Sequence, residues 1–124
     1  MTAEWDLPDD LTAARVARGH VAEDLAHRGV PDAVADDILL AASELAANAI
    51  RHGRPPAVLR LDYPTGRVRV TVSNHGGSPG PIVLDAAPDA DHGRGLAMVQ
   101  ALADEVGWGR DGDRLDVWAE FALS

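Results

Sequence analysis

The stretch RVRVTVSN, residues 67–74, alternates strictly between polar and apolar side chains. Val68, Val70 and Val72 share one face with Asn74, and the remaining polar side chains share the other. A period of two predicts a β-strand with one face buried against a core. Asn74 then points toward the covered face, where a polar side chain needs a partner. The stretch therefore predicts a half-buried strand that ends in a candidate polar site.

Two hairpins are predicted around this pattern. Residues 57–63, AVLRLDY, alternate in the same way, and residues 64–66, PTG, suit a tight turn before the strand described above. Near the end of the chain, residues 104–108, DEVGW, and 114–123, RLDVWAEFAL, flank the turn-like residues 109–113, GRDGD. We therefore expect two antiparallel hairpins.

Helical periodicity fills the rest of the chain, apart from a Gly-, Pro- and Asp-rich loop at residues 76–92. Apolar positions at spacings of three and four predict helices over residues 9–28, Asp32 to His52, and 95–104. The expected inward-facing residues are Leu11, Ala14, Ala17, Val21 and Leu25, then Val34, Ile38, Ala41 or Ala42, Leu45 and Ala49, and finally Leu96, Met98, Val99 and Leu102.

The order of these elements, two helices, a hairpin, a loop, a helix and a second hairpin, predicts an α+β two-layer sandwich. Its helices should cover one face of a mainly antiparallel sheet. A length of 124 residues is enough for one domain with a single core, so we expect one domain over residues 1–124.

Composition excludes several classes of function. The sequence has no cysteine, which rules out disulfides, thiolate metal sites and a cysteine nucleophile. A net charge of −9, from 11 basic and 20 acidic residues, argues against direct binding of nucleic acid. No apolar run approaches the roughly 20 residues of a membrane span, and the acidic N-terminus does not resemble a signal peptide. We expect a cytoplasmic protein without membrane contact.

Glu44 and Asn48 are four residues apart in SELAANAIRHG, residues 43–53, so both project from one face of the second predicted helix. A carboxylate can accept a proton from a hydroxyl group. An amide oxygen is a hard ligand that suits Mg²⁺. The spacing alone is also compatible with a solvated pair on a helix surface, since the pattern E-x-x-x-N is common by chance.

Two glycine-rich stretches follow. Residues 74–80, NHGGSPG, allow close approach of the backbone to a ligand. Residues 93–96, GRGL, open the third predicted helix, where free N–H groups and the helix dipole favour phosphate. Either stretch taken alone is also compatible with an ordinary loop.

Taken in order, these motifs resemble the ATP-binding domain of the GHKL group of gyrase, heat-shock chaperone, histidine kinase and mismatch-repair ATPases. The match is closest to the small anti-sigma-factor serine/threonine kinases that are abundant in actinobacteria, and it covers roughly residues 5–123. The resemblance implies a Bergerat-type α+β sandwich with a mixed, mainly antiparallel sheet.

The resemblance also implies roles for individual residues, with ATP and Mg²⁺ as cofactors. Glu44 matches the general base that activates the attacking hydroxyl, and Asn48 matches the Mg²⁺ ligand. Residues 77–92 match the lid that closes over the nucleotide. The nucleotide-binding residues implied by the match are Asn48, Asn74, Gly76, Gly93, Arg94, Gly95 and Leu96.

The implied function is regulation of a sigma factor through phosphorylation of a STAS-domain anti-anti-sigma protein, by a protein that forms a homodimer. The alternative is a catalytically weak or inactive partner-switching module that binds a sigma factor or STAS-type regulator with reduced nucleotide affinity. A free-standing ATPase domain of a histidine kinase receives less support, because no phosphoacceptor histidine domain precedes the motifs in this sequence.

Asn74 departs from the family pattern, which has Asp-x-Gly at Asn74-His75-Gly76. The family carboxylate accepts a hydrogen bond from the adenine amino group, and an amide keeps one acceptor but loses the charge. The expected loss is about 1–2 kcal/mol, or about 5–30-fold in affinity. Because an amide can also donate to guanine, we expect reduced selectivity for adenine. Strand alternation places the nearby carboxylate of Asp116 on the opposite face, which argues against its replacing the missing charge.

Overall fold

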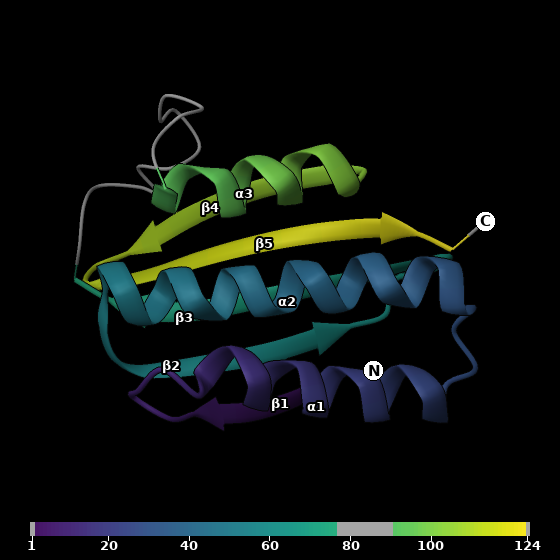
Figure 1. Ribbon diagram of the computed structural model, residues 1–124, viewed down its shortest axis with the longest axis horizontal. Coiled ribbons are helices and arrows are strands. Elements are labelled where there is room, and N and C mark those ends of the chain that lie inside the picture. Colours follow the sequence, from purple (N-terminus) through teal and green to yellow (C-terminus); the bar gives the residue numbers. More distant parts are fainter. Residues whose placement is uncertain (1, 77–90, 124) are drawn as a thin grey trace.

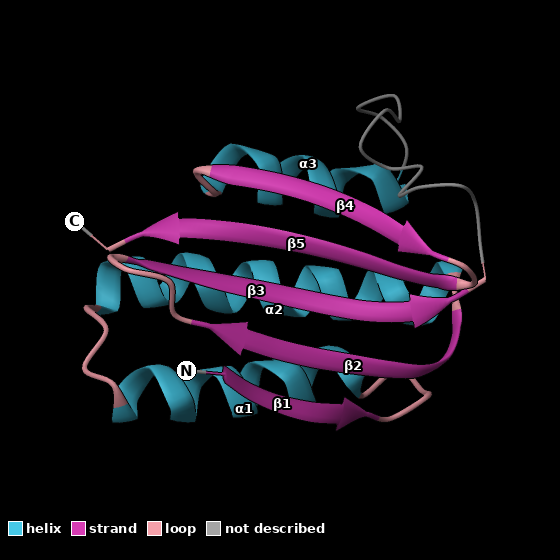
Figure 2. Ribbon diagram, turned by 180° about the vertical axis from the view of Figure 1, so that it is seen from behind, coloured by secondary structure: helices cyan, strands magenta, loops and turns pink. Residues whose placement is uncertain are grey.

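A five-stranded sheet and a layer of three helices form the part of the protein that the computed structural model describes, residues 2–76 and 91–123, with no side chains described for residues 91–96. The strand order is β1-β2-β3-β5-β4, and all four described pairings are antiparallel. The helices cover one face (Figure 1), and no described helix or strand covers the other face (Figure 2). The elements are β1 (Thr2–Leu7), α1 (Ala13–His27), α2 (Asp32–His52), β2 (Arg54–Asp62), β3 (Arg67–His75), α3 (Asp91–Leu102), β4 (Glu105–Asp111) and β5 (Arg114–Ala122).

The α+β architecture with helices on one face is therefore confirmed. The helix predicted from Asp32 to His52 has these bounds in the structure. It follows α1 after a short turn in which Gly29 adopts a φ of +72°. The Val30 N–H donates to the Leu25 carbonyl at 3.0 Å across this turn. A glycine suits this helix end because the left-handed conformation strains residues with a side chain.

The core lies between the sheet and the helices, where α2 runs along β3 (Figure 1). The predicted alternation of β3 is confirmed, since Val68, Val70 and Val72 are buried and Asn74 is only 4% exposed. Burial of such apolar side chains supplies the main driving force for folding. The largest fully buried side chains are Leu25, Ile38, Leu45, Leu59, Leu61, Val21, Val68, Val70, Val72 and Val99.

Strand β1 was missing from the sequence prediction. It pairs with β2, with Trp5 opposite Leu59, and it forms an edge of the sheet. Its outer side chains Glu4 and Asp6 are exposed. Edge strands commonly carry charges, which discourage pairing with another chain. Ala3, Trp5 and Leu7 alternate with polar residues, so the strand pattern is present in the sequence although it was not interpreted as a strand. On the inner face, Trp5 stacks on His20 with ring centroids 5.1 Å apart.

Two residues predicted to face the core are exposed. Leu11 is 96% exposed, because α1 begins only at Ala13 and Leu11 lies in the preceding turn. Met98 is 42% exposed, whereas its neighbour Val99 is fully buried. The inward stripe of α3 therefore passes through Val99.

The last hairpin is tighter than predicted. Its strand β4 continues to Asp111, which lies opposite Arg114, so Gly112 and Asp113 alone form the turn. Gly112 has a φ of +62°, the left-handed conformation that such two-residue turns favour.

The helix α3 begins earlier than predicted, at Asp91, inside the segment expected to be a loop. Among the described helices, none combines the length and apolar character required to cross a bilayer.

Candidate functional site

The outer part of α2 carries the two side chains that the sequence singled out. Glu44 and Asn48 are both partly buried, one helical turn apart, while Leu45 and Ala49 of the same helix face the core. The structure therefore brings Glu44 and Asn48 to one helix face, as their spacing predicts.

The Asn48 side-chain oxygen, Oδ1, has an unusual environment. It is shielded from solvent and accepts no hydrogen bond within residues 2–76 and 91–123. A buried acceptor without a partner is unfavourable and is rare in folded proteins. An amide oxygen in this condition fits a Mg²⁺ ligand, because the ion would supply the missing partner.

Asn74 meets the C-terminal end of the same helix. Its Nδ2 donates a hydrogen bond to the Ala49 carbonyl at 3.0 Å, and the Gly53 N–H donates to the same oxygen at 3.0 Å. A Cβ atom on Gly53 would lie 1.6 Å from Nδ2 of Asn74, so only glycine leaves room for the amide. Since Ala49 follows Asn48 directly, the end of β3 is joined to the turn of α2 that carries the candidate metal ligand.

Gly76 follows β3 and is held by three neighbouring segments. It has a φ of +70°, its N–H donates to the Asp113 carbonyl at 3.0 Å, and its carbonyl accepts from Nη2 of Arg110 at 3.0 Å. A Cβ atom here would lie 2.6 Å from Nε of Arg54. Both the backbone conformation and the lack of space therefore require glycine where the chain leaves the sheet.

Asp116 lies on the opposite face of the sheet from Asn74. It accepts a hydrogen bond from Ser73 Oγ at 2.6 Å and pairs with Arg114 at 3.3 Å. Directly opposite Asn74 on β5 is the buried, apolar Leu115. Asp116 is therefore unable to supply the carboxylate that Asn74 lacks.

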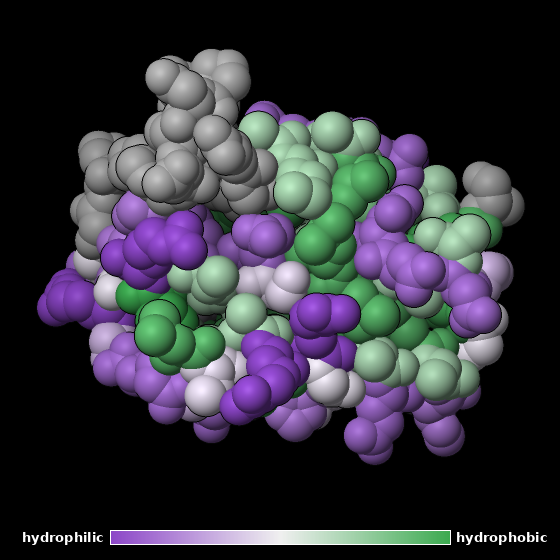
Figure 3. All heavy atoms as spheres, viewed as in Figure 1, coloured by the Kyte–Doolittle hydropathy of each residue, from purple (hydrophilic) through white to green (hydrophobic). Residues whose placement is uncertain are grey.

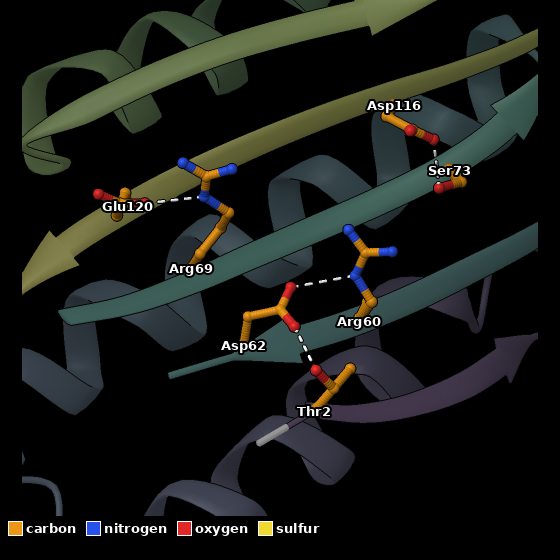
Figure 4. Close-up of polar contacts among 7 residues, drawn as sticks. All are labelled: Thr2, Arg60, Asp62, Arg69, Ser73, Asp116 and Glu120. Carbon is orange, nitrogen blue, oxygen red and sulfur yellow. Dashed lines mark hydrogen bonds and ion pairs between the residues drawn. The ribbon is translucent and has the colours of Figure 1, made fainter. Parts of the chain in front are cut away.

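The uncovered face of the sheet carries a network of charges, shown in Figure 4. Glu120 is only 5% exposed and accepts hydrogen bonds from Arg67 at 2.6 Å and Arg69 at 2.8 Å. The hydrogen bond from Arg67, opposed by burial and reinforced by Arg69, holds the pKa of Glu120 below its ordinary value. Arg60 and Thr2 pair with Asp62 on the same face. Apart from the Arg60–Asp62 pair within β2, these contacts join neighbouring strands, and all of them lie away from Glu44 and Asn48.

The glycine motif at residues 93–96 lies near the start of α3, after Asp91, and not before the helix as predicted. Its side chains, those of Arg94 and Leu96 included, lie outside the described residues, as do residues 77–90 of the predicted lid. The N-terminal end of α3 and the C-terminal end of α2 lie at the same end of the molecule (Figure 1). The backbone of the third motif is therefore at the end where Asn74 and Ala49 meet.

The surface over the helical layer mixes apolar and polar side chains. Figure 3 shows a band of apolar side chains flanked by polar ones on this side of the molecule. Among the described residues, the large apolar side chains that are exposed are Leu11, Met98 and Trp108. Leu11 adjoins a small surface pocket that Ala47 and Ile50 of α2 also line.

Sequence reasoning missed the partners of two site residues. Gly53 was interpreted only as the end of a helix, and Arg110 only as part of a turn. The alternation of β3 indicates that Asn74 needs a partner, but it does not identify the Ala49 carbonyl, 25 residues earlier in the chain. No local pattern marks Arg110 as the donor to Gly76.

Comparison with known proteins identifies the family of this chain. A family model described as the histidine kinase-like ATPase domain matches residues 7–121. None of the curated proteins compared with the sequence matches it. The chain therefore belongs to the histidine kinase-like ATPase family, and the resemblance noted from its motifs is confirmed.

Several solved structures share the fold. The crystal structure of the RsbU and RsbW domains of Rv1364c from Mycobacterium tuberculosis has a TM-score of 0.76 and 25% identity. The match covers 99% of this chain and 32% of that chain, so this chain spans about a third of that protein. The SiaB-SiaC complex from Pseudomonas aeruginosa has a TM-score of 0.70 and 12% identity, over 96% of this chain and 88% of that chain. The histidine kinase domain of the blue-light activated histidine kinase from Erythrobacter litoralis EL346 has a TM-score of 0.57 and 23% identity. This match covers 89% of this chain and 61% of that chain. The last two similarities show the fold alone.

Proposed function

We propose that this protein is an ATP-dependent serine/threonine kinase of the anti-sigma-factor type. The observation that carries the proposal is the partly buried face of α2, where Glu44 lies one turn from Asn48 and the Asn48 oxygen has no hydrogen-bond partner among the described residues. Membership of the histidine kinase-like ATPase family supports ATP as the ligand.

Each site residue has one task in this proposal. Glu44 accepts the proton of the attacking serine hydroxyl, as a positioned carboxylate can. Asn48 holds Mg²⁺ through its side-chain oxygen, and the ion, when bound, neutralises charge on the phosphates. Asn74 and Gly76 lie on the base side of the site. Residues 93–96 hold the phosphates through backbone N–H groups near the start of α3.

The proposed protein substrate is a STAS-domain anti-anti-sigma protein, and the regulated target is a sigma factor. The match to the crystal structure of the RsbU and RsbW domains of Rv1364c supports this proposal, because its RsbW domain shares one chain with an RsbU domain. A homodimer is part of the same proposal, by resemblance to the family.

Transfer of phosphate from labelled ATP to candidate STAS proteins of the same genome tests this function. With Mg²⁺ present, wild-type protein should label its partner on serine, and Glu44→Gln should reduce transfer by at least about 100-fold because the proton acceptor is lost. Nucleotide binding by Glu44→Gln should stay close to that of the wild type. Transfer that survives this substitution unchanged would contradict the role of Glu44.

A second candidate is a partner-switching module without kinase activity. The observation that favours it is the amide of Asn74 at the position where the family has a carboxylate. Tight binding of a sigma factor or STAS protein, with no phosphate transfer at saturating ATP, would establish this alternative in place of the kinase.

A further inference from the structure

The side-chain amide of Asn74 makes a contact that the carboxylate of an aspartate at the same position would not make. Its Nδ2 donates to the Ala49 carbonyl at 3.0 Å, and it sits in the space left by the missing side chain of Gly53. Asn74 is only 4% exposed, so water is not a ready substitute for this bond. The contact therefore requires a donor at residue 74 and a glycine at residue 53.

An ionised aspartate at residue 74 has no proton to donate. It would also face the C-terminal end of α2, where carbonyl groups carry the negative end of the helix dipole. Desolvation and these carbonyls both disfavour the charged form, so the pKa of an aspartate placed here would rise. The family carboxylate would therefore be unfavourable in this chain unless it turned away from α2.

We propose that Asn74 is a positioning residue, which holds the last turn of α2 against β3 through the Ala49 carbonyl. Because Ala49 directly follows Asn48, the bond fixes the turn that carries the candidate metal ligand. Asparagine at residue 74 is, on this basis, an adaptation to the close contact with Gly53 and Ala49 and not a damaged aspartate.

The same hydrogen bond determines which end of the Asn74 amide can contact the purine base of a nucleotide. This extension of the proposal rests on the proposed ATP-binding function. With Nδ2 directed toward Ala49 and Gly53, the oxygen Oδ1 lies at the other end of the planar amide group and points away from these two residues. An oxygen accepts from the exocyclic amine of adenine, but it repels the carbonyl oxygen of guanine. The expectation of reduced adenine selectivity, drawn from the sequence alone, is therefore replaced by a preference for ATP.

The test compares Asn74→Asp, Asn74→Ala and Gly53→Ala with the wild type by thermal unfolding from pH 4 to pH 8. Gln100→Glu, which adds one negative charge at an exposed position of α3, is the matched control for charge. Because the folded-state pKa of the new aspartate is raised, the stabilising contribution of its acid form is complete below the unfolded pKa of about 4. This contribution is lost as the pH rises through the folded pKa. The melting temperature of Asn74→Asp should therefore be lower than that of the wild type, and the difference should grow with pH to about 5 °C or more at pH 8.

Asn74→Ala and Gly53→Ala should each lower the melting temperature by a similar amount at every pH, because they remove or displace the donor without adding a titrating group. Gln100→Glu should leave it nearly unchanged. An Asn74→Asp variant as stable as the wild type at pH 8, with ATP affinity raised about 5–30-fold, would overturn the proposal, since that is the behaviour of a restored family aspartate.

Calorimetric titration with ATP and GTP supplies the second readout. Wild-type protein should bind ATP at least about 10-fold more tightly than GTP, a difference of roughly one hydrogen bond. Equal affinities would overturn the assigned orientation of the amide. If neither nucleotide binds while the pH-dependent deficit of Asn74→Asp is present, the positioning role stands and the proposed ATP-dependent function fails.

Discussion

Asn48 shows how a single residue can serve a ligand at the expense of the fold. Its side-chain oxygen is buried without a hydrogen-bond partner among the described residues, on a helix where asparagine is a weaker helix former than alanine. Such an arrangement has no benefit for folding and is typical of sites where stability is given up for binding.

We predict that Asn48→Ala keeps or raises the melting temperature of the ligand-free protein while it weakens Mg²⁺-dependent ATP binding. The substitution removes a buried acceptor without a partner, which lowers the free energy of unfolding by about 1–3 kcal/mol in the wild type. It also replaces asparagine by alanine, a better helix former. Thermal unfolding and calorimetric titration measure the two effects.

Thr71→Val is the matched control for Asn48→Ala. Its Oγ1 is also buried without a hydrogen-bond partner in the described part of the chain, but it lies on the other face of the sheet. This variant should be as stable as the wild type or more so, with ATP binding unchanged. A large loss of stability in Asn48→Ala would show that its amide has a structural partner instead.

At the scale of elements, cross-strand contacts join β3 to β5 on the uncovered face of the sheet (Figure 4). Glu120 bridges to Arg67 and Arg69, and the Arg69 guanidinium lies 4.2 Å from the ring centre of Trp118. The same ring packs over Gly107 of β4, where a Cβ atom would lie 2.3 Å from it. Two predictions follow from these contacts.

Glu120→Gln should lower the melting temperature by roughly 5 °C near neutral pH, because the buried bridge to two arginines is lost. The pKa of Glu120 is lowered in the folded protein, so its stabilising effect is present above its unfolded value of 4.5 and disappears as the pH falls through the folded value. The difference between wild type and variant should therefore shrink below about pH 4.5. A difference that is constant with pH would contradict the assigned charge of Glu120.

Gly107→Ala should destabilise the protein, since the added methyl group displaces the Trp118 ring from its position between β4 and Arg69. Overpacking of this kind typically costs about 1–3 kcal/mol. Gly109→Ala is the control, because a Cβ atom at Gly109 meets no other atom within 4 Å. Denaturant unfolding of both variants distinguishes the loss of this packing from the general effect of replacing glycine in a strand.

At the scale of the whole molecule, the candidate site is assembled from α2, β3 and α3, so ligand binding should stabilise the fold. An ATP concentration 100 times the dissociation constant adds about 2.7 kcal/mol to the free energy of unfolding. This corresponds to a rise of about 10 °C in the melting temperature. The rise should require Mg²⁺ and vanish when the ion is chelated, and a melting temperature insensitive to Mg²⁺-ATP would contradict the proposed ligand.

Much of the architecture could be predicted from the sequence, for a physical reason. Helix α2 and the inward faces of β2 and β3 follow from side-chain periodicity, which is a property of neighbouring residues. Residues 2–7 of β1 show the same alternation of polar and apolar side chains, so this strand could also have been predicted from periodicity. Its pairing with β2, 50 to 60 residues later, depends on contacts that no local pattern encodes. The position of Leu11 depended on where α1 begins, and helix ends are set by local capping and by packing.

The sequence alone determined that Glu44 and Asn48 share a helix face and that Asn74 points inward, because these relations depend only on the pitch of a helix and the pleat of a strand. Only the tertiary structure decided what Asn74 contacts. The docking of α2 on β3 brings the Ala49 carbonyl to the amide and places Gly53 where a side chain would collide with it. Contacts between residues so far apart in the chain arise from the packing of whole elements, and no local pattern encodes them.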